Sequence, residues 1–228
     1  MSKPVIVLRP EPGQTETLVA AFQSGLEASG MPLCSISPVD WKAPAKPYDG
    51  VLVGSANALR HAGKELEKIT HLPVIAVGEA TARLAQDAGM ELELVGKGGL
   101  QTVLGTLPSI QRNLLRLAGE VHLPLDALGK VSIDTVITYR TDYRRLSSKQ
   151  VAFLAQGAVV LLHSGEMAAH FARECDANKL DRHSFDCIAM APRIAERAGE
   201  GWGSLTIAKG VSDASLLAAA QALCEKQV

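Results

Sequence analysis

The 228-residue sequence has few aromatic residues, no excess of one charge and no long apolar run near its start, features that mark several classes of protein. Only 4% of its residues are aromatic, and 23 lysines and arginines stand against 24 aspartates and glutamates, for a formal net charge of −1. There is therefore no basic excess for nucleic acid and no long block of like charge typical of a disordered tail. The apolar run after Lys3 is too short for a signal peptide or a membrane span. These absences predict a soluble, cytoplasmic protein with neither a membrane nor a nucleic acid as partner.

Metal-binding spacing is also missing. The four cysteines are scattered without a C-x-x-C pair, which favours free thiols in a reducing cytosol: Cys34, Cys175, Cys187 and Cys224. The six histidines are dispersed, and His163 and His170 do not have the spacing of two ligands on one helical face. We expect them to be packing or surface residues, and we expect no metal site.

Nucleotide and nucleophile motifs are weak or absent. The G-K-G-G step at Gly96 is neither a P-loop nor the G-x-G-x-x-G fingerprint. Ser164-Gly165 lacks the flanking glycine of a nucleophile elbow. The sequence therefore gives little support for a nucleotide site or for Ser-His-Asp chemistry.

What the sequence does have is a regular alternation of short apolar runs and helical segments of roughly ten residues, typical of doubly wound parallel sheets. We expect strands over 5–8, 33–37, 51–54, 74–78, 92–96, 113–119, 131–143, 158–164, 186–191 and 205–210. We expect helices over 55–66, 79–89, 98–107, 147–157, 165–176, 192–199 and 212–226. An earlier helix carries Leu18, Phe22 and Leu26 at helical spacing and ends at Gly30. The strand at 131–143 is expected to be isolated.

The second half of the chain echoes the first at an offset of roughly half the chain length, which indicates internal duplication. The stretch AVGEATARLAQDAG at 76–89, for example, resembles AMAPRIAERAGEG at 189–201. The element at the end of the first series has its counterpart at the N-terminus, so the halves are permuted. The predicted fold is α/β, with two pseudo-duplicated, doubly wound parallel-sheet domains joined by a two-stranded β linker. The expected bounds are 1–36 with 143–228 for domain 1, 46–128 for domain 2, and 37–45 and 129–142 for the linkers that form a hinge.

Polar residues and glycines recur where predicted strands end and helices begin: Ser55, Asn57, Thr81, Gly98, Gly99, Ser164 and Ser212. Backbone N–H groups at such junctions bind anions at the carboxyl edge of a parallel sheet. Each junction alone is equally explained as an ordinary helix N-cap. Two such edges that face each other would form a cleft. Five arginines at predicted strand ends or linkers are either solvated surface charges or, where they face that cleft, contacts for a polyanion: Arg9, Arg116, Arg140, Arg144 and Arg145.

Taken in order, these stretches resemble the uroporphyrinogen-III synthase family over nearly the whole chain. The resemblance is carried by VIVLRPEPGQTETLVAAF, the Ser-Ala-Asn-Ala of VLVGSANAL, AVGEATARLAQDAG, LLRLAGE, TVITYRT and the C-terminal Ala-Leu helix. It implies a cofactor-independent hydro-lyase of tetrapyrrole (haem, sirohaem, cobalamin or chlorophyll) biosynthesis. Its substrate would be hydroxymethylbilane, an open-chain tetrapyrrole with eight carboxylates, which it closes with loss of water and inversion of the last ring. The resemblance also implies two α/β domains with a cleft between them, a monomer, and transient contact with hydroxymethylbilane synthase.

The resemblance also assigns residues. Tyr139, in TVITYRT, matches the family's linker tyrosine, thought to assist departure of the hydroxyl as proton donor or positioner; packing in the hinge is the alternative. The expected substrate-binding residues are Arg9, Ser55, Ala56, Asn57, Gly78, Thr81, Arg116, Ser164 and Arg193.

Two junctions depart from the family pattern. A Gly-Pro-Thr-Thr-Ala-like step appears as Ala191-Pro192-Arg193-Ile194-Ala195, and a Ser-Pro-Ser step as Ser164-Gly165-Glu166. Arg193 could replace the missing hydroxyls with a charged contact to a substrate carboxylate. Equally, the loss favours a rival hypothesis, a non-catalytic tetrapyrrole-binding or regulatory protein with the same fold. A periplasmic type of two-domain binding protein is disfavoured by the absence of a signal peptide.

Overall fold

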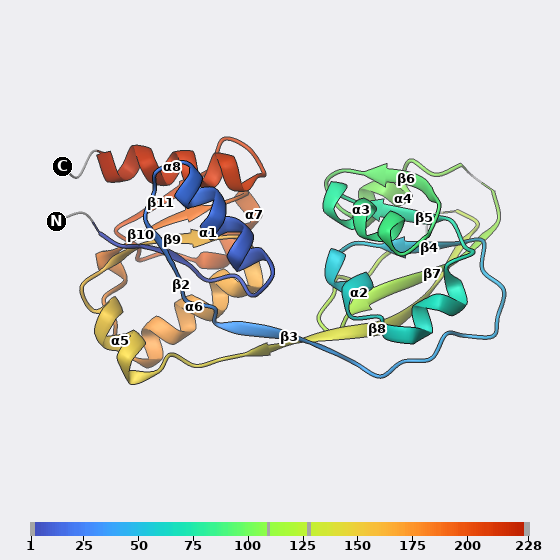
Figure 1. Ribbon diagram of the computed structural model, residues 1–228, viewed down its shortest axis with the longest axis horizontal. Coiled ribbons are helices and arrows are strands. Elements are labelled where there is room, and N and C mark those ends of the chain that lie inside the picture. The colour runs from blue at the N-terminus through green and yellow to red at the C-terminus, as the bar shows by residue number, and fades with distance from the viewer. Residues whose placement is uncertain (1–2, 109, 127–128, 226–228) are drawn as a thin grey trace. The chain divides into compact units, whose positions relative to one another are not determined.

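The computed structural model describes residues 3–108, 110–126 and 129–225. The chain forms two compact units (Figure 1). Unit 1 contains the chain up to Ser35 and again from Tyr143 onward, and unit 2 contains Ile36–Asp142. Some residues of the predicted domains and of the last predicted helix lie outside the described residues: 1, 2, 109, 127, 128 and 226–228.

Unit 1 is built on a five-stranded sheet in the order β11-β10-β9-β1-β2, and every pairing in it is parallel. The strands are β1 (Val5–Val7), β2 (Ala28–Gly30), β9 (Ala158–Leu162), β10 (Phe185–Ala189) and β11 (Ser204–Ile207). The helices are α1 (Gly13–Gln23), α5 (Ser148–Leu154), α6 (Gly165–Ala177), α7 (Pro192–Ala198) and α8 (Asp213–Glu225), with a short 3-10 turn, η2 (Arg182–Ser184). The prediction of a parallel α/β sheet is confirmed.

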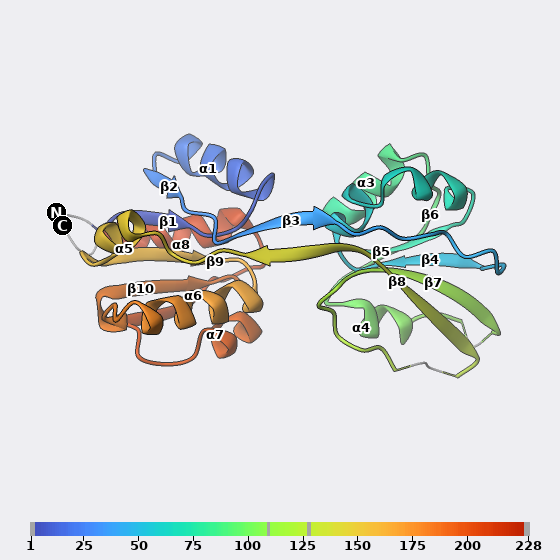
Figure 2. The ribbon, with the colours of Figure 1, turned by 90° about the horizontal axis from the view of Figure 1, so that it is seen from below.

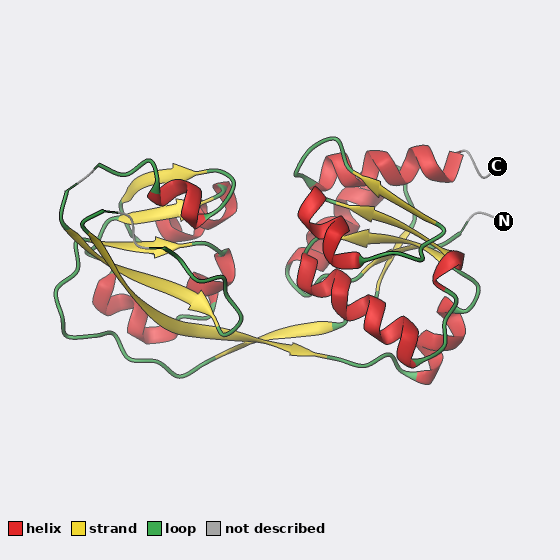
Figure 3. Ribbon diagram, turned by 180° about the vertical axis from the view of Figure 1, so that it is seen from behind, coloured by secondary structure: helices red, strands yellow, loops and turns green. Residues whose placement is uncertain are grey.

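The strands of unit 1 are buried on both faces because helices cover both. Ile6 and Leu8 of the first strand segment pack with residues of α5, α6 and α7, whereas Val5 and Val7 pack with residues of α1 and α8. Figures 2 and 3 show helices on both sides of this sheet. Alternate side chains of a strand point to opposite faces, so a fully apolar run fits a strand between two helical layers.

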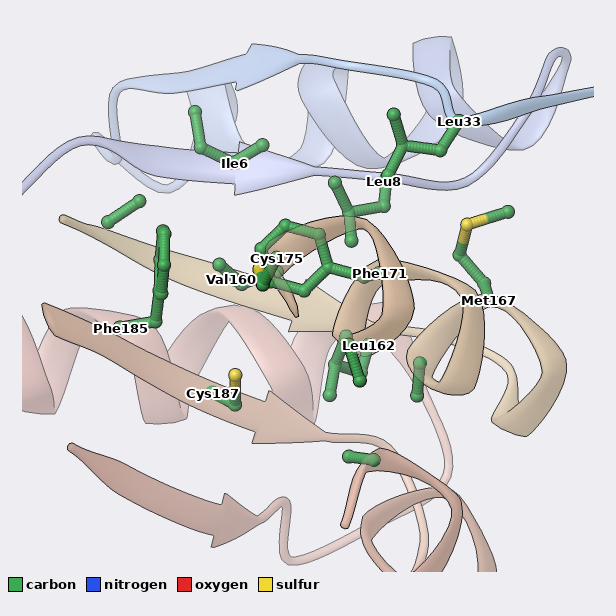
Figure 4. Packing of buried hydrophobic residues seen from close by; sticks show 14 of the residues in the cluster. Ile6, Leu8, Leu33, Val160, Leu162, Met167, Phe171, Cys175, Phe185 and Cys187 are labelled. Carbon is green, nitrogen blue, oxygen red and sulfur yellow. The ribbon is translucent and has the colours of Figure 1, made fainter. Parts of the chain in front are cut away.

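Three of the chain's few aromatic residues meet in the core of unit 1. Phe171 of α6 stacks on Trp202 at a centroid distance of 5.6 Å and meets Phe185 of β10 edge-on at 5.5 Å. Figure 4 shows Phe171 and Phe185 among the aliphatic side chains and thiols of this core. Burial raises the pKa of Cys34 to about 11 and that of Cys175 to about 12, so both thiols are protonated at neutral pH.

Unit 2 is built on a six-stranded sheet in the order β3-β8-β7-β4-β5-β6. The strands are β3 (Cys34–Pro38), β4 (Gly50–Val53), β5 (Val74–Val77), β6 (Leu92–Gly96), β7 (Arg112–Gly119) and β8 (Val131–Tyr143). One face is covered by α2 (Ala56–Arg60), the 3-10 helix η1 (Gly63–Ile69) and α3 (Glu79–Asp87), and the other by α4 (Leu100–Leu104). Figure 2 shows α3 and α4 on opposite sides of this sheet.

The strand β8 is not isolated, and that expectation is wrong. It pairs in parallel with β7 from Arg112 opposite Val131 to Gly119 opposite Tyr139. On its other side it neighbours β3, and Arg144 N donates to Leu33 O (2.8 Å) while Val39 N donates to Thr138 O (3.0 Å). The physical reason is that β7 is almost wholly buried, so its outer edge requires a partner strand.

Two helix predictions are also corrected. The first helix, α1, ends at Gln23, and Phe22 is 84% exposed, so the expected apolar stripe through Phe22 is wrong. Gly25 takes a left-handed φ of 77° and turns the chain into β2. The predicted helix at 55–66 is divided into α2 and η1 at Gly63, whose φ is 60°. In the described part of the chain, no helix has the length and apolar character to cross a membrane.

Candidate functional site

The carboxyl edge of the unit 1 sheet has a topological switch point between β1 and β9. From β1 the chain continues to β2 on one side, whereas β9 leads to β10 and β11 on the other. Ligands of open α/β sheets bind outside the carboxyl ends of the strands at such a point. Arg9 follows β1 there, and His163 and Ser164 follow β9.

Four side chains meet at this switch point and form what we call the edge cluster: Arg9, Thr17, His163 and Asp213. Arg9 Nη1 donates to Asp213 Oδ2 at 3.2 Å and to Oδ1 at 3.3 Å, and Thr17 Oγ1 donates to Asp213 Oδ2 at 2.7 Å. His163 Nε2 lies 3.3 Å from Asp213 Oδ1 and 3.4 Å from Thr17 Oγ1. Thr17 is fully buried and the His163 side chain is 7% exposed. The cluster thus joins both sides of the switch point to the first turn of α8.

The electrostatics of the edge cluster favour an ionised Asp213. Burial by itself raises the pKa of this carboxyl group, but hydrogen bonds from His163 and Thr17 and the charges of His163 and Arg9 outweigh that and lower it. The carboxylate in turn fixes Arg9, whose side chain remains 30% exposed. A partly exposed guanidinium held in place by a carboxylate suits recognition of a substrate carboxylate.

The edge cluster is not a nucleophile–base–acid relay. Such a relay needs the two ring nitrogens of the histidine to face different partners. Here Nε2 of His163 faces both Thr17 and Asp213, while Nδ1 is buried and has no hydrogen-bond partner among the described residues. The cluster can therefore position a charged donor, and it offers no activated hydroxyl.

The other predicted residues of unit 1 lie along the same edge. Ser164 is the N-cap of α6 and accepts from Met167 N at 3.2 Å, and Ser212 Oγ accepts from Ser215 N at 3.2 Å at the start of α8. Ala191 caps α7 without a side-chain hydrogen bond. Arg193 is exposed, and within the described residues its side chain has no hydrogen bond or ion pair. The N-cap explanation thus holds at Ser164 and Ser212, and binding by these residues stays a prediction.

We expect Ser164→Ala to destabilise the protein by about 1 kcal/mol, because the α6 N-cap loses its acceptor. Urea unfolding measures this, with Ser29→Ala, a substitution at an exposed position of β2, as the matched control. Equal stability of the two variants would show that the cap contributes nothing.

In unit 2 the switch point lies between β4 and β7, since β4 leads to β5 and β6 while β7 leads to β8. Gly119 ends β7 at this edge, and the half-buried Tyr139 of β8 lies directly over it. A Cβ atom on Gly119 would come within 2.5 Å of Tyr139 Cζ and 2.8 Å of its Oη. The His61 ring lies 6.4 Å from the Tyr139 ring. No described residue hydrogen-bonds to Tyr139 Oη, so the hydroxyl is available to a ligand.

Arg116 corrects one expectation. It was expected at a strand end or linker, with surface charge as the default, but it lies inside β7 and is 7% exposed. Its Nη1 donates to Leu123 O at 2.9 Å, and its Nε is buried and has no partner in the part of the chain that the structure describes. Burial lowers its pKa, and the nearby Tyr139 opposes that shift. No carboxylate of a described residue pairs with this buried guanidinium, so Arg116 favours a negatively charged group in the region of Tyr139.

The remaining predicted residues of unit 2 are at helix starts. Ser55 caps α2 by accepting from Asn57 N at 3.3 Å, and Asn57 Oδ1 accepts from Arg60 at 2.6 Å. Ala56 is the first residue of α2. Gly78 caps α3 with a φ of 81°, and Thr81 is only 4% exposed. The structure thus gives Ser55 and Asn57 local structural roles and leaves little of Thr81 accessible.

Sequence reasoning missed Thr17, Asp213, Gly119 and the position of His163 beside them. The available signal was topological. Once β1 and β9 are recognised as the two strands of a switch point, the residues after them and the start of the helix that packs nearby become candidates. Among the described residues, no group of three histidine, cysteine, aspartate or glutamate side chains is arranged to hold a metal ion.

These features define a two-unit α/β protein with charged and polar groups at the carboxyl edges of two parallel sheets. A family model described as uroporphyrinogen-III synthase HemD matches residues 16–218, so the chain belongs to the uroporphyrinogen-III synthase family. This is a family of enzymes that act on a tetrapyrrole in porphyrin biosynthesis.

Solved structures show the same fold. A uroporphyrinogen-III synthetase from Helicobacter pylori superposes with a TM-score of 0.66 at 14% identity, covering 97% of this chain and 99% of its own. A mutant uroporphyrinogen III synthase from Thermus thermophilus superposes with a TM-score of 0.61 at 17% identity, covering 99% of this chain and 100% of its own. A search of curated proteins gave no match.

Proposed function

We propose that this protein converts hydroxymethylbilane into uroporphyrinogen III. The observation that carries the proposal, beside family membership, is the free hydroxyl of Tyr139 at the carboxyl edge of unit 2. Loss of water from the bilane requires a proton for the departing hydroxyl, and a phenol can donate one. Tyr139 is the proton donor or positioner in this proposal.

The chemistry balances without a redox step. The C–O bond of the hydroxymethyl group breaks, the oxygen leaves as water with the donated proton, and an azafulvenium cation remains. The substituted carbon of the last ring attacks that cation to form a spiro intermediate, whose rearrangement inverts the ring before closure. The final aromatisation returns one proton, and a substrate carboxylate is the acceptor we propose.

The difficulty of the reaction is selectivity, because the bilane closes without help to the non-inverted isomer. The enzyme therefore has to hold the chain so that attack at the substituted carbon occurs first. We propose that substrate carboxylates bind at the carboxyl edge of each unit. Arg9, Ser164 and Arg193 of unit 1 and Ser55, Ala56, Asn57, Gly78, Thr81 and Arg116 of unit 2 are the proposed contacts.

The proposal also covers the cofactor requirement, the oligomeric state, the location and the partner of the enzyme. A dehydration of this kind needs no redox cofactor, because no electrons are exchanged with the protein, and we propose that the reaction proceeds without any cofactor. We propose that the enzyme acts as a monomer in the cytoplasm. It would receive its substrate in transient contact with hydroxymethylbilane synthase.

One observation favours a second candidate, a non-catalytic tetrapyrrole-binding protein. In the first turn of α7, Arg193 and Ile194 stand where the family pattern has two threonine hydroxyls, and Arg193 is exposed. A binding protein would keep the carboxyl-edge contacts and lose turnover.

The deciding experiment supplies bilane from a coupled deaminase and separates the product isomers. We expect isomer III to exceed isomer I in the presence of the protein, whereas the enzyme-free control gives isomer I. Thermal stabilisation by a linear tetrapyrrole without excess isomer III would favour the binding protein. If the protein shows neither thermal stabilisation nor excess isomer III, both candidates are contradicted.

A further inference from the structure

Unit 1 contains a pocket that the proposed reaction does not use. It has a volume of about 510 Å³ and lies between the segment Tyr143–Leu146 and the C-terminal half of α6. From α6 it is lined by His170, Arg173 and Glu174, among others. Arg173 lies nine residues beyond the N-cap Ser164, which places it roughly 13 Å along the helix axis from the carboxyl edge. Figure 3 shows α6 as a long helix on one side of the unit 1 sheet.

The backbone that carries two of the pocket's arginines is fixed by hydrogen bonds. Arg144 N donates to Leu33 O at 2.8 Å, and His170 Nε2 lies 2.8 Å from Arg144 O. Leu146 N donates to Glu174 Oε2 at 2.7 Å. His170 and Glu174 are each 8% exposed, so these bonds are sheltered from water. The segment is therefore held in one geometry before any ligand arrives.

The arginine side chains of the pocket, by contrast, have no partners. Within the described residues, Arg144, Arg145 and Arg173 make no side-chain hydrogen bond or ion pair. Other arginines of the described chain are paired with carboxylates: Arg9, Arg112, Arg140, Arg182 and Arg197. Three guanidinium groups thus share one concave site with the single carboxylate of Glu174.

Like charges gathered in one concavity repel one another, and a bound anion removes that repulsion. The Glu174 carboxylate offsets this repulsion only in part, because it is buried and one of its oxygens accepts from Leu146 N. Tyr143 supplies a further donor at the rim, and its ring packs against His170 at a centroid distance of 4.8 Å. The pocket therefore combines a fixed backbone with exposed cationic donors that no described residue engages, which is the composition of an oxyanion site.

We propose that this pocket binds a small multivalent oxyanion, a polyphosphate or polycarboxylate, through Arg144, Arg145 and Arg173. Guanidinium groups donate in pairs to carboxylate and phosphate oxygens alike. A pocket of this volume accommodates a ligand of the size of pyrophosphate or citrate. The chain re-enters unit 1 at Tyr143. Such a ligand would bridge the segment that begins there and α6, and would so stabilise unit 1. The site is separate from the carboxyl edge, so the anion bound there would be an effector or a stored anion and not the substrate.

Calorimetric titration of the full chain with pyrophosphate and with citrate, at constant ionic strength, tests the proposal. We expect saturable binding of at least one of them, and the one that binds identifies the oxyanion class. The double variant Arg144→Gln/Arg173→Gln should weaken binding at least about tenfold, because each lost guanidinium removes charge-assisted hydrogen bonds. Arg83→Gln, which removes an exposed arginine of α3 in unit 2, is the matched control and should bind as the unaltered protein does.

Arg9→Gln separates the pocket from the edge cluster and should leave anion binding unchanged. Hydrogen exchange gives a second measurement: the anion should slow exchange of Leu146 N and its neighbours in the unaltered protein and not in the double variant. Circular dichroism establishes that the variants are folded. Absence of binding by both anions at millimolar concentration, or equal binding by the double variant and the Arg83 control, would overturn the proposal.

Discussion

Tyr139→Phe is expected to lower kcat for formation of isomer III about 100-fold, the lower end of what proton transfer by a side chain contributes. The substitution removes only the hydroxyl, which no described residue engages, so the ring should keep its place over Gly119. Since substrate carboxylates bind elsewhere in our proposal, KM should change little. Stopped assays with isomer separation measure both constants.

The matched control is Tyr48→Phe, which removes a phenol hydroxyl that donates to the exposed Asp134. It should leave kcat unchanged. If Tyr139→Phe also leaves kcat unchanged, Tyr139 is not part of the mechanism. A raised KM with unchanged kcat would instead assign it to substrate binding.

Gly119→Ala tests the same assignment without touching the phenol. The new methyl group would occupy the space of the Tyr139 ring, at 2.5 Å from Cζ, so the ring must move. Misplacement of a catalytic group by about 1 Å can reduce a rate about 100-fold. If Gly119→Ala acts through Tyr139, its effect should be much smaller in the Tyr139→Phe background, and the two losses should not add. Additive losses would show that Gly119 acts by another route.

The fold could be predicted largely from the sequence, because its signals are local. Strands β4, β5 and β9 are continuous apolar runs, β10 is apolar except for Asp186, and a helix follows each of them after a few residues. Such runs fit only strands covered on both faces, and short strands alternating with helices imply parallel pairing. The local signal failed at Phe22, which is exposed, and at Leu26, where the apolar spacing continued past the end of α1. Spacing alone does not show where a helix stops.

The two-stranded β linker was expected, and β8 does neighbour β3, but the pairing of β8 with β7 could not be predicted in this way. Within β8 only Val131 and Thr138 are buried and the other residues are half-buried or exposed, which fits an isolated strand or an edge equally. The pairing is decided by β7, a different part of the chain, because its buried edge needs a neighbouring strand. The placement of Tyr139 over Gly119 follows from that pairing and from the register shift beside it.

The edge cluster could not be predicted from the sequence for the same reason. Arg9 and Asp213 are 204 residues apart in the chain, and Thr17 and His163 are 146 apart. Arg9 could be proposed because it follows a strand, whereas Asp213 reads as an ordinary acidic residue in the first turn of a helix. Only the strand order, with β1 beside β9, brings the four side chains together.

Asp213→Asn is expected to destabilise the protein by about 2 kcal/mol at pH 7, the range for hydrogen bonds to a charged group. The amide cannot accept from Arg9, Thr17 and His163 together, and it leaves the Arg9 guanidinium without its counter-charge. Chemical denaturation at fixed pH gives the free energy of unfolding. Asp134→Asn, at an exposed carboxylate paired with Lys46, is the matched control and should have a much smaller effect.

The difference between the unaltered protein and Asp213→Asn should depend on pH in a defined direction. The folded protein lowers the pKa of Asp213, so its carboxylate stabilises the fold at pH values above about 4, the range of an unfolded aspartate. That contribution is lost as the pH falls through the lowered pKa of the folded state. The difference should therefore be constant between about pH 5 and 7 and shrink in more acidic solution. A difference that grows on acidification would show that Asp213 is protonated in the native protein, and the edge cluster would then hold Arg9 without an ion pair.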